Sequence, residues 1–340
     1  MYSAEKLTGK TKTVCVGRYV VDVPVEAQIS MSHERIAGFG IETFEENQAD
    51  FDARVSAREV EIVERGAGET GSDDGGMIEA HDLRIPGLSG RAFVFGRSRG
   101  HVMEGDQRVD MESVSVEVHA HMRDLSFSLT DESTQEDSVR KAEALLARIQ
   151  PIRGTGIPTT PGFCAARAFF AEPLPPHKSE HIAMHIGFLN HPDVMLSFAS
   201  MPGGGSGRSL LTRFADIDRD ASVDELVRVT KLRMGPRTIN GISGEEVMAR
   251  TREFNFASTY GFIWETAGAR DDLLHPFLTL ELQGGVSPNS GGEPVDTTLH
   301  QDAVLTLWDR ISSSIRLRSN TLSKSGRGIT PFSPGDRNRL

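Results

Sequence analysis

The feature of this sequence that most constrains its fold is an internal repeat. Three segments of the first half match three segments of the second half in the same order. One pair shares a cysteine, an arginine and a proline in register: Cys15, Arg18 and Pro24 against Cys164, Arg167 and Pro173. The other pairs are residues 87–94 against 241–248, and 145–149 against 307–311. Each match is short, but their common order predicts two copies of one structural module.

The repeat places a domain boundary near the middle of the chain. We expect one domain over residues 1–154 and a second over 163–318, and 340 residues is a suitable length for two. Residues 154–162 between them are rich in Pro, Gly and Thr, which is typical of linkers. The end of the chain after Ile315 is basic and rich in Ser, Gly and Pro. We predict that this end, Arg316 and Arg318 included, is disordered, with a flexible tail over 319–340, and a docking segment is the alternative.

Hydrophobic periodicity predicts the same elements in each half. Each half opens with a strand around its cysteine that ends at the proline, followed by a helix, near residues 47–64 or 223–232. Residues 113–122 alternate apolar and polar side chains, and a turn at Arg123 and Asp124 leads into a second alternating strand. An amphipathic helix closes each half, with these apolar positions: Val139, Ala142, Leu146 and Ile149; Ala303, Leu307, Trp308 and Ile311. The predicted fold class is α+β, each domain an antiparallel sheet with helices packed on one face.

Charge and hydropathy argue against two classes of partner. The net charge of −11 repels phosphate backbones, so we expect no nucleic acid partner. No apolar run approaches the roughly 20 residues of a membrane helix, so we expect no membrane span. The polar start at Met1 does not resemble a secretory signal. It predicts a cytoplasmic protein if Met1 is the native start, or a secreted one whose leader has been removed.

The two cysteines and the two repeated arginines have several interpretations. Cys15 and Cys164 lie among apolar neighbours, where buried, unreactive thiols are the default. A disulfide between the two lobes and a nucleophilic role are the alternatives. For Arg18 and Arg167 we favour a structural use, each pairing with Asp22 or Glu172 or holding the facing lobe.

No catalytic motif or cofactor motif is present, so we predict neither an enzyme nor a bound cofactor. His119 and His121 lie two apart on the polar face of a strand, where a solvated face is the favoured interpretation over a metal site. His181 and His185 lie in another strand-like segment, and we expect no ligand role for them. The run from Gly203 to Arg208 is glycine-rich but has no lysine, so a flexible loop is favoured over a phosphate site.

Two segments are candidates for partner contact because they are Gly-rich and carry arginine, as recognition loops do. They are the predicted loops at residues 98–107 and 203–208, with ordinary exposed loops as the alternative. The candidate contact residues in and around them are Arg97, Arg99, His101, Met103, Arg108, Met201 and Arg208.

Several of these segments together resemble a known family. Residues 13–24 with their Cys15-Val16-Gly17-Arg18 core, and the segments 162–164, 191–194 and 209–213, are similar to the two-domain immunity proteins of type VI secretion lipase effectors. The resemblance implies binding of a toxic phospholipase of α/β-hydrolase fold, with its lid or substrate entrance kept closed. It also implies a periplasmic location, and we expect a monomer in the absence of the partner.

Two other functions remain open from the residues alone. A two-lobed ligand-binding or scaffold protein of the cell envelope would hold an apolar pocket between its lobes. An unrecognised hydrolase would depend on residues such as His119 and His121. Inhibition of a lipase requires no reactive group, only a complementary surface with a few strong contacts.

Overall fold

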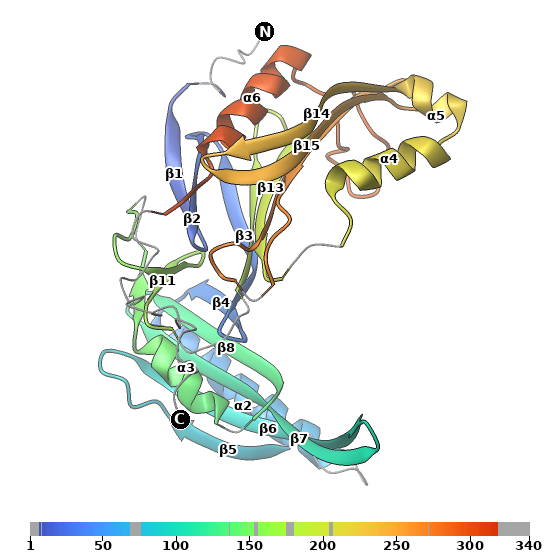
Figure 1. Ribbon diagram of the computed structural model, residues 1–340. Helices are drawn as coiled ribbons and strands as arrows, with labels where there is room; N and C mark the ends of the chain where they lie inside the picture. The colour runs from blue at the N-terminus through green and yellow to red at the C-terminus, as the bar shows by residue number, and fades with distance from the viewer. Residues whose placement is uncertain are drawn as a thin grey trace, which may run out of the picture.

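The computed structural model describes residues 7, 9–68, 76–135, 137–152, 156–174, 180–203, 207–270 and 272–318. Figure 1 shows two lobes, with α2 and β5 to β8 in one and α6 and β13 to β15 in the other. The predicted tail at 319–340, residues 154 and 155 of the linker and Gly204 to Ser206 lie outside the described residues.

The two halves contain the same kinds of element in the same order. The first half contains β1 (Thr11–Val16), β2 (Tyr19–Pro24), β3 (Gln28–Ile36), β4 (Phe39–Glu45), α2 (Gln48–Gly68), β5 (Met77–Asp82), β6 (Ser89–Glu104), β7 (Gln107–Met122), β8 (Leu125–Thr134), α3 (Ser138–Leu146) and β9 (Ile149–Pro151). The second half contains β10 (Gly162–Cys164), β11 (Ala168–Ala171), β12 (His181–Gly187), β13 (Val194–Met201), α4 (Leu210–Asp220), α5 (Val223–Arg228), β14 (Val229–Ile239), β15 (Ile242–Arg252), β16 (Ser258–Glu265), β17 (Phe277–Gly284), α6 (Gln301–Ser314) and β18 (Arg316–Leu317). None of the described helices is both long and apolar enough to cross a membrane.

The two halves share one large sheet. Its twelve strands run in the order β14-β15-β16-β17-β13-β12-β3-β4-β8-β7-β6-β5, and the pairings within it are antiparallel. The halves meet where β12 pairs with β3, with Ile186 opposite Ile29. The α+β class predicted from periodicity is therefore confirmed, and the sheet continues through the middle of the molecule.

Two small sheets join the ends of the halves reciprocally. The hairpin β1-β2 of the first half is completed by β18 from the end of the second half. The hairpin β10-β11 of the second half is completed by β9 from the end of the first. Each half therefore contributes a strand to the other, and neither small sheet is complete within one half.

The prediction that helices cover one face of the sheet is wrong for the first half. Successive side chains of β6 point to opposite faces. Val94 belongs to the main core together with Leu145 of α3, whereas Phe93 packs in a separate cluster with Phe51 and Val55 of α2. The helices α2 and α3 thus lie on opposite faces of the same strands.

This double covering also corrects the interpretation of the two histidines on β7. His119 and His121 are 4% and 3% exposed, so they do not lie on a solvated face. The His121 ring stacks on Phe51 of α2, and each histidine hydrogen bonds to a serine of β8 through Nδ1, at 2.7 and 2.8 Å. The alternation in the sequence marks the strand correctly, but a polar face can be buried when a helix supplies partners for it.

Three local predictions also need correction. The helix predicted near 223–232 is the short α5, followed directly by β14, and α4 before it was not predicted. Ile149 is not part of the closing helix but begins β9. Arg316 and Arg318 are part of the fold: Arg316 pairs with Asp22, and buried Arg318 donates to backbone carbonyls near the linker.

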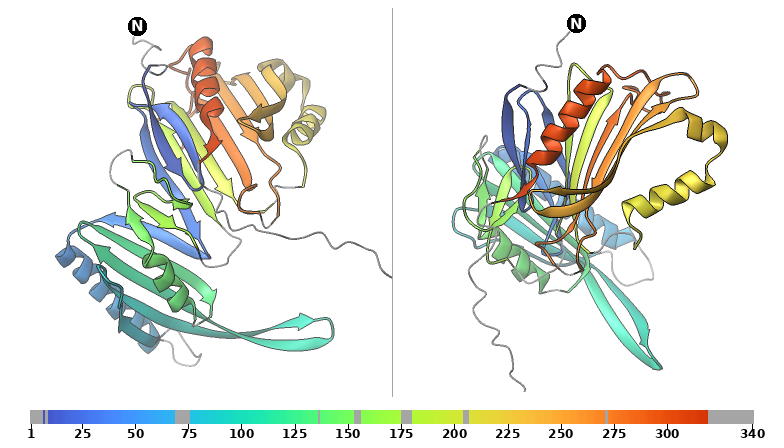
Figure 2. Two further views of the ribbon diagram at one scale, coloured as in Figure 1. Left: turned by 60° about the vertical axis from the view of Figure 1, so that its left-hand side comes forward. Right: turned by 45° about the horizontal axis from the view of Figure 1, so that its top comes forward.

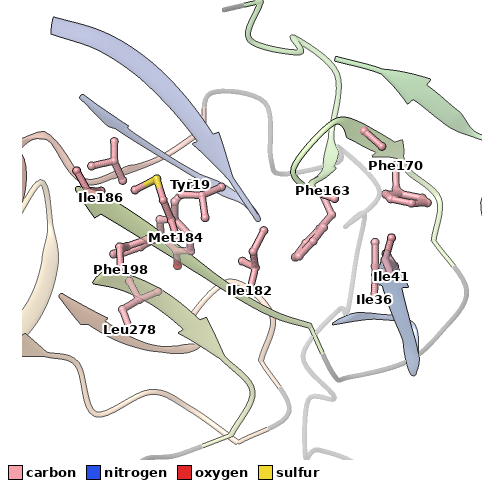
Figure 3. Packing of buried hydrophobic residues seen from close by; sticks show 14 of the residues in the cluster. Tyr19, Ile36, Ile41, Phe163, Phe170, Ile182, Met184, Ile186, Phe198 and Leu278 are labelled. Atoms are coloured by element: carbon pink, nitrogen blue, oxygen red, sulfur yellow. The ribbon is translucent and has the colours of Figure 1, made fainter. Parts of the chain in front are cut away.

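The main core runs without interruption from one lobe into the other. Figure 3 shows Phe163 between Ile182 of β12 and the Ile36 and Ile41 side chains at the start of the other lobe. All four side chains belong to one buried cluster. Because the lobes share this core as well as the sheet, we expect them to unfold together.

The two cysteines form a disulfide, which corrects the expectation of buried free thiols. Reciprocal hydrogen bonds of 2.9 Å between the backbones of Gly17 and Cys164 bring the turn after β1 against β10. They place the Cα atoms of Cys15 and Cys164 5.8 Å apart, within the range a disulfide can bridge. The match between Cys15 and Cys164 in the repeat was the signal available in the sequence.

The repeated arginines connect the two halves, as the structural interpretation predicted. Arg18 is buried and forms 2.7 Å hydrogen bonds to Glu172 and to both carboxylate oxygens of Glu180. Arg167 pairs with Glu45 of β4. Pro24 ends β2 as expected, and Pro173 follows β11 closely.

A partly buried carboxylate in the first half gives a prediction about acid stability. Burial alone would raise the pKa of Glu117, but Arg58, at 2.6 and 2.9 Å, and His119 stabilise the carboxylate and lower its pKa from 4.5 to about 2. The folded pKa lies below the unfolded one, so this stabilisation is present above pH 4.5 and is lost as the pH falls towards 2. We expect Glu117→Gln to remove on the order of 3 kcal/mol at neutral pH.

Urea denaturation of Glu117→Gln and the unchanged protein at several pH values measures this effect. The difference in unfolding free energy should shrink between pH 4.5 and 2. Glu61→Gln is the matched control, because Glu61 also contacts Arg58 at 2.9 Å but its side chain is 62% exposed. A pH-independent difference would contradict the prediction.

Candidate partner-binding surface

Two arms extend from the body of the protein. The hairpin arm consists of residues 97–112, the far ends of β6 and β7, and the helical arm consists of α4 and α5. In Figure 1 and in the left view of Figure 2 both arms lie on the right-hand side of the molecule. They come from different lobes, so a partner that touches both would contact the two halves of the chain.

The hairpin arm contains five of the seven contact residues predicted from the sequence: Arg97, Arg99, His101, Met103 and Arg108. The predicted loop at 98–107 is, however, a two-stranded ribbon that pairs as far as Glu104 and Gln107. The ribbon was missed because both of its faces are exposed beyond the body of the sheet, so no burial imposes an apolar alternation on its sequence.

Apolar side chains are unusually exposed on the hairpin arm. Val102, Met103, Val109 and Met111 are 43%, 60%, 37% and 51% exposed. The charged groups pair within the arm: Glu112 contacts both Arg97 and Arg99, and Arg108 lies 2.8 Å from Asp110. Hydrogen bonding from Arg99 and the charge of Arg97 lower the pKa of Glu112. The arm therefore presents apolar surface bordered by ion pairs.

The remaining two predicted contact residues lie in the other lobe. Met201 is a partly exposed residue at the end of β13. Arg208 precedes α4, pairs with Asp216 and lines a hollow of about 570 Å³ at the start of that helix. The structure therefore divides the candidate residues between the hairpin arm and the other lobe and does not gather them at one point.

The helical arm encloses a groove that sequence reasoning did not predict. Its volume is about 870 Å³, and the sheet forms its floor. Val247 and Ala249 of β15 lie beside Ile263 and Gly261 of β16 on that floor. The only buried side chain of α4 is Leu210, and α5 has none.

The walls of the groove carry apolar and acidic side chains. Ile217 of α4 and Leu226 of α5 are 58% and 43% exposed although they line it. Five carboxylates and one ammonium group also line it: Asp216, Asp218, Asp220, Glu225 and Glu281, with Lys231. The floor of the groove is thus apolar over β15 and β16, and carboxylates of α4, α5 and β17 line the rest of it.

A third hollow lies where the lobes meet, and it does not suit an apolar ligand. It has a volume of about 960 Å³, and its lining includes Ser30, Ser32, His33 and Glu34 of β3. The pocket expected of a lobed carrier for lipid or another apolar ligand would be lined mainly by hydrophobic side chains.

The histidines of β12 and the family-like segments have structural partners. His181 stacks on His33 at 5.4 Å, and His185 lies 2.8 Å from the Ser32 hydroxyl. Across the described ranges, no three His, Cys, Asp or Glu side chains are grouped so that they could hold a metal ion. Buried Asp193 accepts hydrogen bonds from the backbone and hydroxyl of Thr298, which connects the β12-β13 turn to the segment before α6.

Comparison with protein families gives a match over nearly all of the chain. Residues 12–152 match the Tle cognate immunity protein 4 N-terminal domain, and residues 156–320 match the C-terminal domain of the same family. The chain belongs to the Tle cognate immunity protein 4 family. This confirms the family that the cysteine-containing repeats suggested, and it makes the chain an immunity protein.

Solved structures of immunity proteins share the fold of this Tle cognate immunity protein 4 family member. The apo structure of immunity protein TplEi of the T6SS from Pseudomonas aeruginosa is 22% identical with a TM-score of 0.72, over 93% of this chain and 99% of that chain. TplEi complexed with "L" peptide is 22% identical with a TM-score of 0.67, over 91% and 98% of the two chains. A chain of the Tle4-Tli4 complex is 22% identical with a TM-score of 0.71, over 91% and 98%. Comparison with curated proteins gave no match.

Proposed function

We propose that this immunity protein binds a Tle lipase effector through both arms and keeps the lid or substrate entrance of the lipase closed. The effector would be a phospholipase of α/β-hydrolase fold. The observation that carries the proposal is the pair of arms that project on one side from different lobes. The family name and the solved Tle4-Tli4 complex support a lipase as the partner.

A grip of this kind needs no reactive group on the immunity protein. Inhibition by occlusion requires a large complementary surface whose affinity exceeds the free energy of lid opening. A few apolar anchors at the centre of such a surface carry most of the binding energy. The exposed Met103 and Met111 of the hairpin arm are suited to this role because methionine adapts its shape to a partner.

We also propose that the two halves arose by duplication of one α+β module. Matched glycines support this, because each allows a close approach of the neighbouring strand. A Cβ atom on Gly90 would lie 2.2 Å from the carbonyl oxygen of His119, and one on Gly244 would lie 2.5 Å from that of Glu265. The sheet order, which places corresponding elements symmetrically about β3 and β12, also supports a common origin.

A periplasmic location is the third part of the proposal. The disulfide between Cys15 and Cys164 supports it, because structural disulfides persist in the periplasm and are rare in the reducing cytoplasm. A lipase effector delivered to the cell envelope would meet the immunity protein there.

Lipase inhibition by variants with introduced charges tests the proposed binding through the hairpin arm. In the variant Met103→Glu/Met111→Glu, two charges would have to be desolvated at the interface, so we expect inhibition to weaken by about 30-fold or more, the equivalent of one hot spot. The measurement is phospholipid hydrolysis by a Tle lipase effector, titrated with immunity protein. The matched control is Val60→Glu/Val63→Glu, which alters exposed valines of α2, 54% and 52% exposed. Full hydrolysis at excess unchanged protein would refute the function, and equal inhibition by both variants would refute the role of the hairpin arm.

A further inference from the structure

The side chains on one face of the sheet are packed differently in the two halves. The repeat aligns Phe93 of the first half with Val247 of the second, and two residues further along each strand Phe95 with Ala249. In the first half, Phe93 and Phe95 pack against Phe51 of α2 in a closed apolar cluster. The large aromatic side chains fill the space between the helix and the strands.

In the second half the corresponding space is open. Valine and alanine replace the two phenylalanines, and Gly261 beside Ala249 adds no side chain at all. The helices α4 and α5 do not fill the volume that the two phenylalanines occupy in the first half, because Leu210 is the only buried side chain of these two helices. The result is the groove of about 870 Å³ beneath the helical arm.

The chemistry of the groove specifies what would fill it. Apolar side chains that remain exposed in water around a concave surface indicate a binding site for another apolar surface. Three of the five carboxylates are paired with cations: Asp218 with Lys231, Asp216 with Arg208 and Arg219, and Asp220 with Arg219. Among the described residues, Glu225 of α5 and Glu281 of β17 form no ion pair and leave the groove with a negative charge. A complementary occupant is therefore apolar where it meets the strands and basic where it meets the rim.

We propose that an apolar segment of the lipase effector, flanked by lysine or arginine, inserts between the helical arm and the sheet of the second half. The inference rests on the proposed function, in which the lipase is the partner. It assigns the insertion site to the groove on β15 and β16, and the acidic rim guides the basic flank of the segment into place.

Gly261→Val tests the insertion by filling the groove from its floor. A Cβ atom at Gly261 meets no atom within 4 Å, and its backbone is not in the left-handed region, so valine fits the folded protein. Valine is also favoured in strands, so folding should be retained. We expect affinity for the Tle lipase effector to fall by about 30-fold or more, as when an interfacial hot spot is lost. Calorimetry or surface binding measures the affinity, and thermal unfolding verifies the fold.

Gly187→Val is the matched control. Gly187 lies on the same row and face of the sheet, three strands away on β12, and a Cβ atom there also meets nothing within 4 Å. It does not line the groove, so we expect unchanged affinity. A second variant, Glu281→Gln, removes one acidic group from the groove, and we expect a slower association and a weaker dependence of the association rate on salt.

Each outcome decides between occupants. Loss of affinity in Gly261→Val alone supports insertion of the lipase segment. Full affinity in both glycine variants refutes insertion into the groove but leaves the proposed function unaffected. Loss of affinity in both variants places the contact on the open face of the sheet and refutes the groove as the specific binding site. A dimer that Gly261→Val dissociates, with lipase affinity unchanged, would make a second copy of this chain the occupant and overturn the proposal. If the unchanged protein does not bind the lipase, the proposed function fails and the insertion with it.

Discussion

Reduction of the disulfide between Cys15 and Cys164 should lower the free energy of unfolding by about 5 kcal/mol, the loop-entropy value for a crosslink of this length. The two cysteines are 149 residues apart, so the crosslink restricts nearly half of the unfolded chain. The folded state changes less, because the Gly17 and Cys164 backbones remain hydrogen bonded without the disulfide. Guanidinium denaturation with and without a thiol reductant measures the difference.

The variant Cys15→Ala/Cys164→Ala provides the control for the disulfide. It should be about as unstable as the reduced protein, and the reductant should not change its denaturation midpoint. Equal stability of the oxidised and reduced protein would contradict the prediction. It would also remove the main support for an oxidising compartment.

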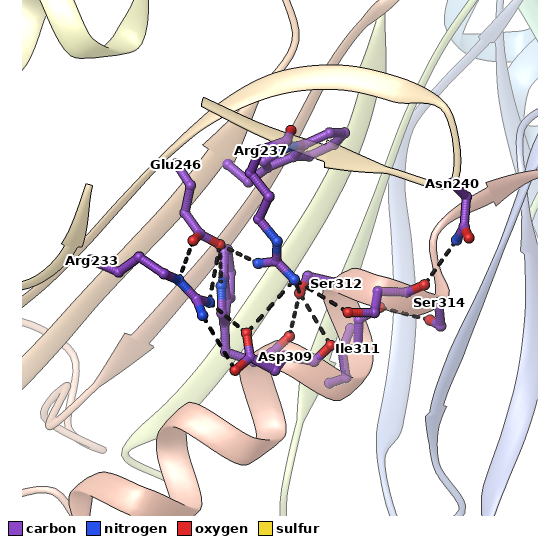
Figure 4. A network of polar contacts seen from close by, with 11 residues as sticks. Arg233, Arg237, Asn240, Glu246, Asp309, Ile311, Ser312 and Ser314 are labelled. Atoms are coloured by element: carbon purple, nitrogen blue, oxygen red, sulfur yellow. Dashed lines mark hydrogen bonds and ion pairs between the residues drawn. The ribbon is translucent and has the colours of Figure 1, made fainter. Parts of the chain in front are cut away.

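The substitution Glu246→Ala should destabilise the protein by about 3 to 5 kcal/mol, the usual cost of removing one partner from a buried ion pair. Glu246 is 1% exposed and contacts Arg233 and Arg237, while the indole Nε1 of Trp308 donates to it at 2.7 Å. Figure 4 shows this carboxylate between the two guanidinium groups of β14, facing α6. Its loss leaves Arg237, whose side chain is 18% exposed, without its main counter-charge, and removes the acceptor of a buried indole.

Asp309→Ala is the matched control for this network. Asp309 on α6 pairs with Arg233, but its side chain is 46% exposed, so we expect its removal to cost less than about 1 kcal/mol. Glu246→Gln should lie between the two, because its amide oxygen still accepts from Trp308 while the charge is lost. Urea denaturation gives all three values, and a cost for Glu246→Ala as small as that for Asp309→Ala would refute the role of the buried carboxylate.

The helical arm shows why the candidate site was only partly predictable. The arginines and methionines of the hairpin arm were found because composition marked that segment, although its ribbon structure was not predicted. The groove was missed because no single segment contains it: its floor comes from β15 and β16 and its walls from α4 and α5. One signal was available in the sequence: the repeat aligns Phe93 with Val247, so the second half has a smaller side chain at the matched position.

Local periodicity in the sequence was sufficient to predict the hairpin of β7 and β8, the helix α2 and the apolar stripe of α6. Each of these depends on contacts that recur every two or every three to four residues, so the pattern lies within one segment. The tertiary structure alone decided that β3 pairs with β12, that the cysteines meet, and that α2 packs closely over His119 and His121 while α4 and α5 leave a groove over β15 and β16. Those outcomes depend on which distant segment packs on a given face of the sheet. The sequence of a strand shows whether the side chains on a face are polar or small, but it does not show which segment covers that face.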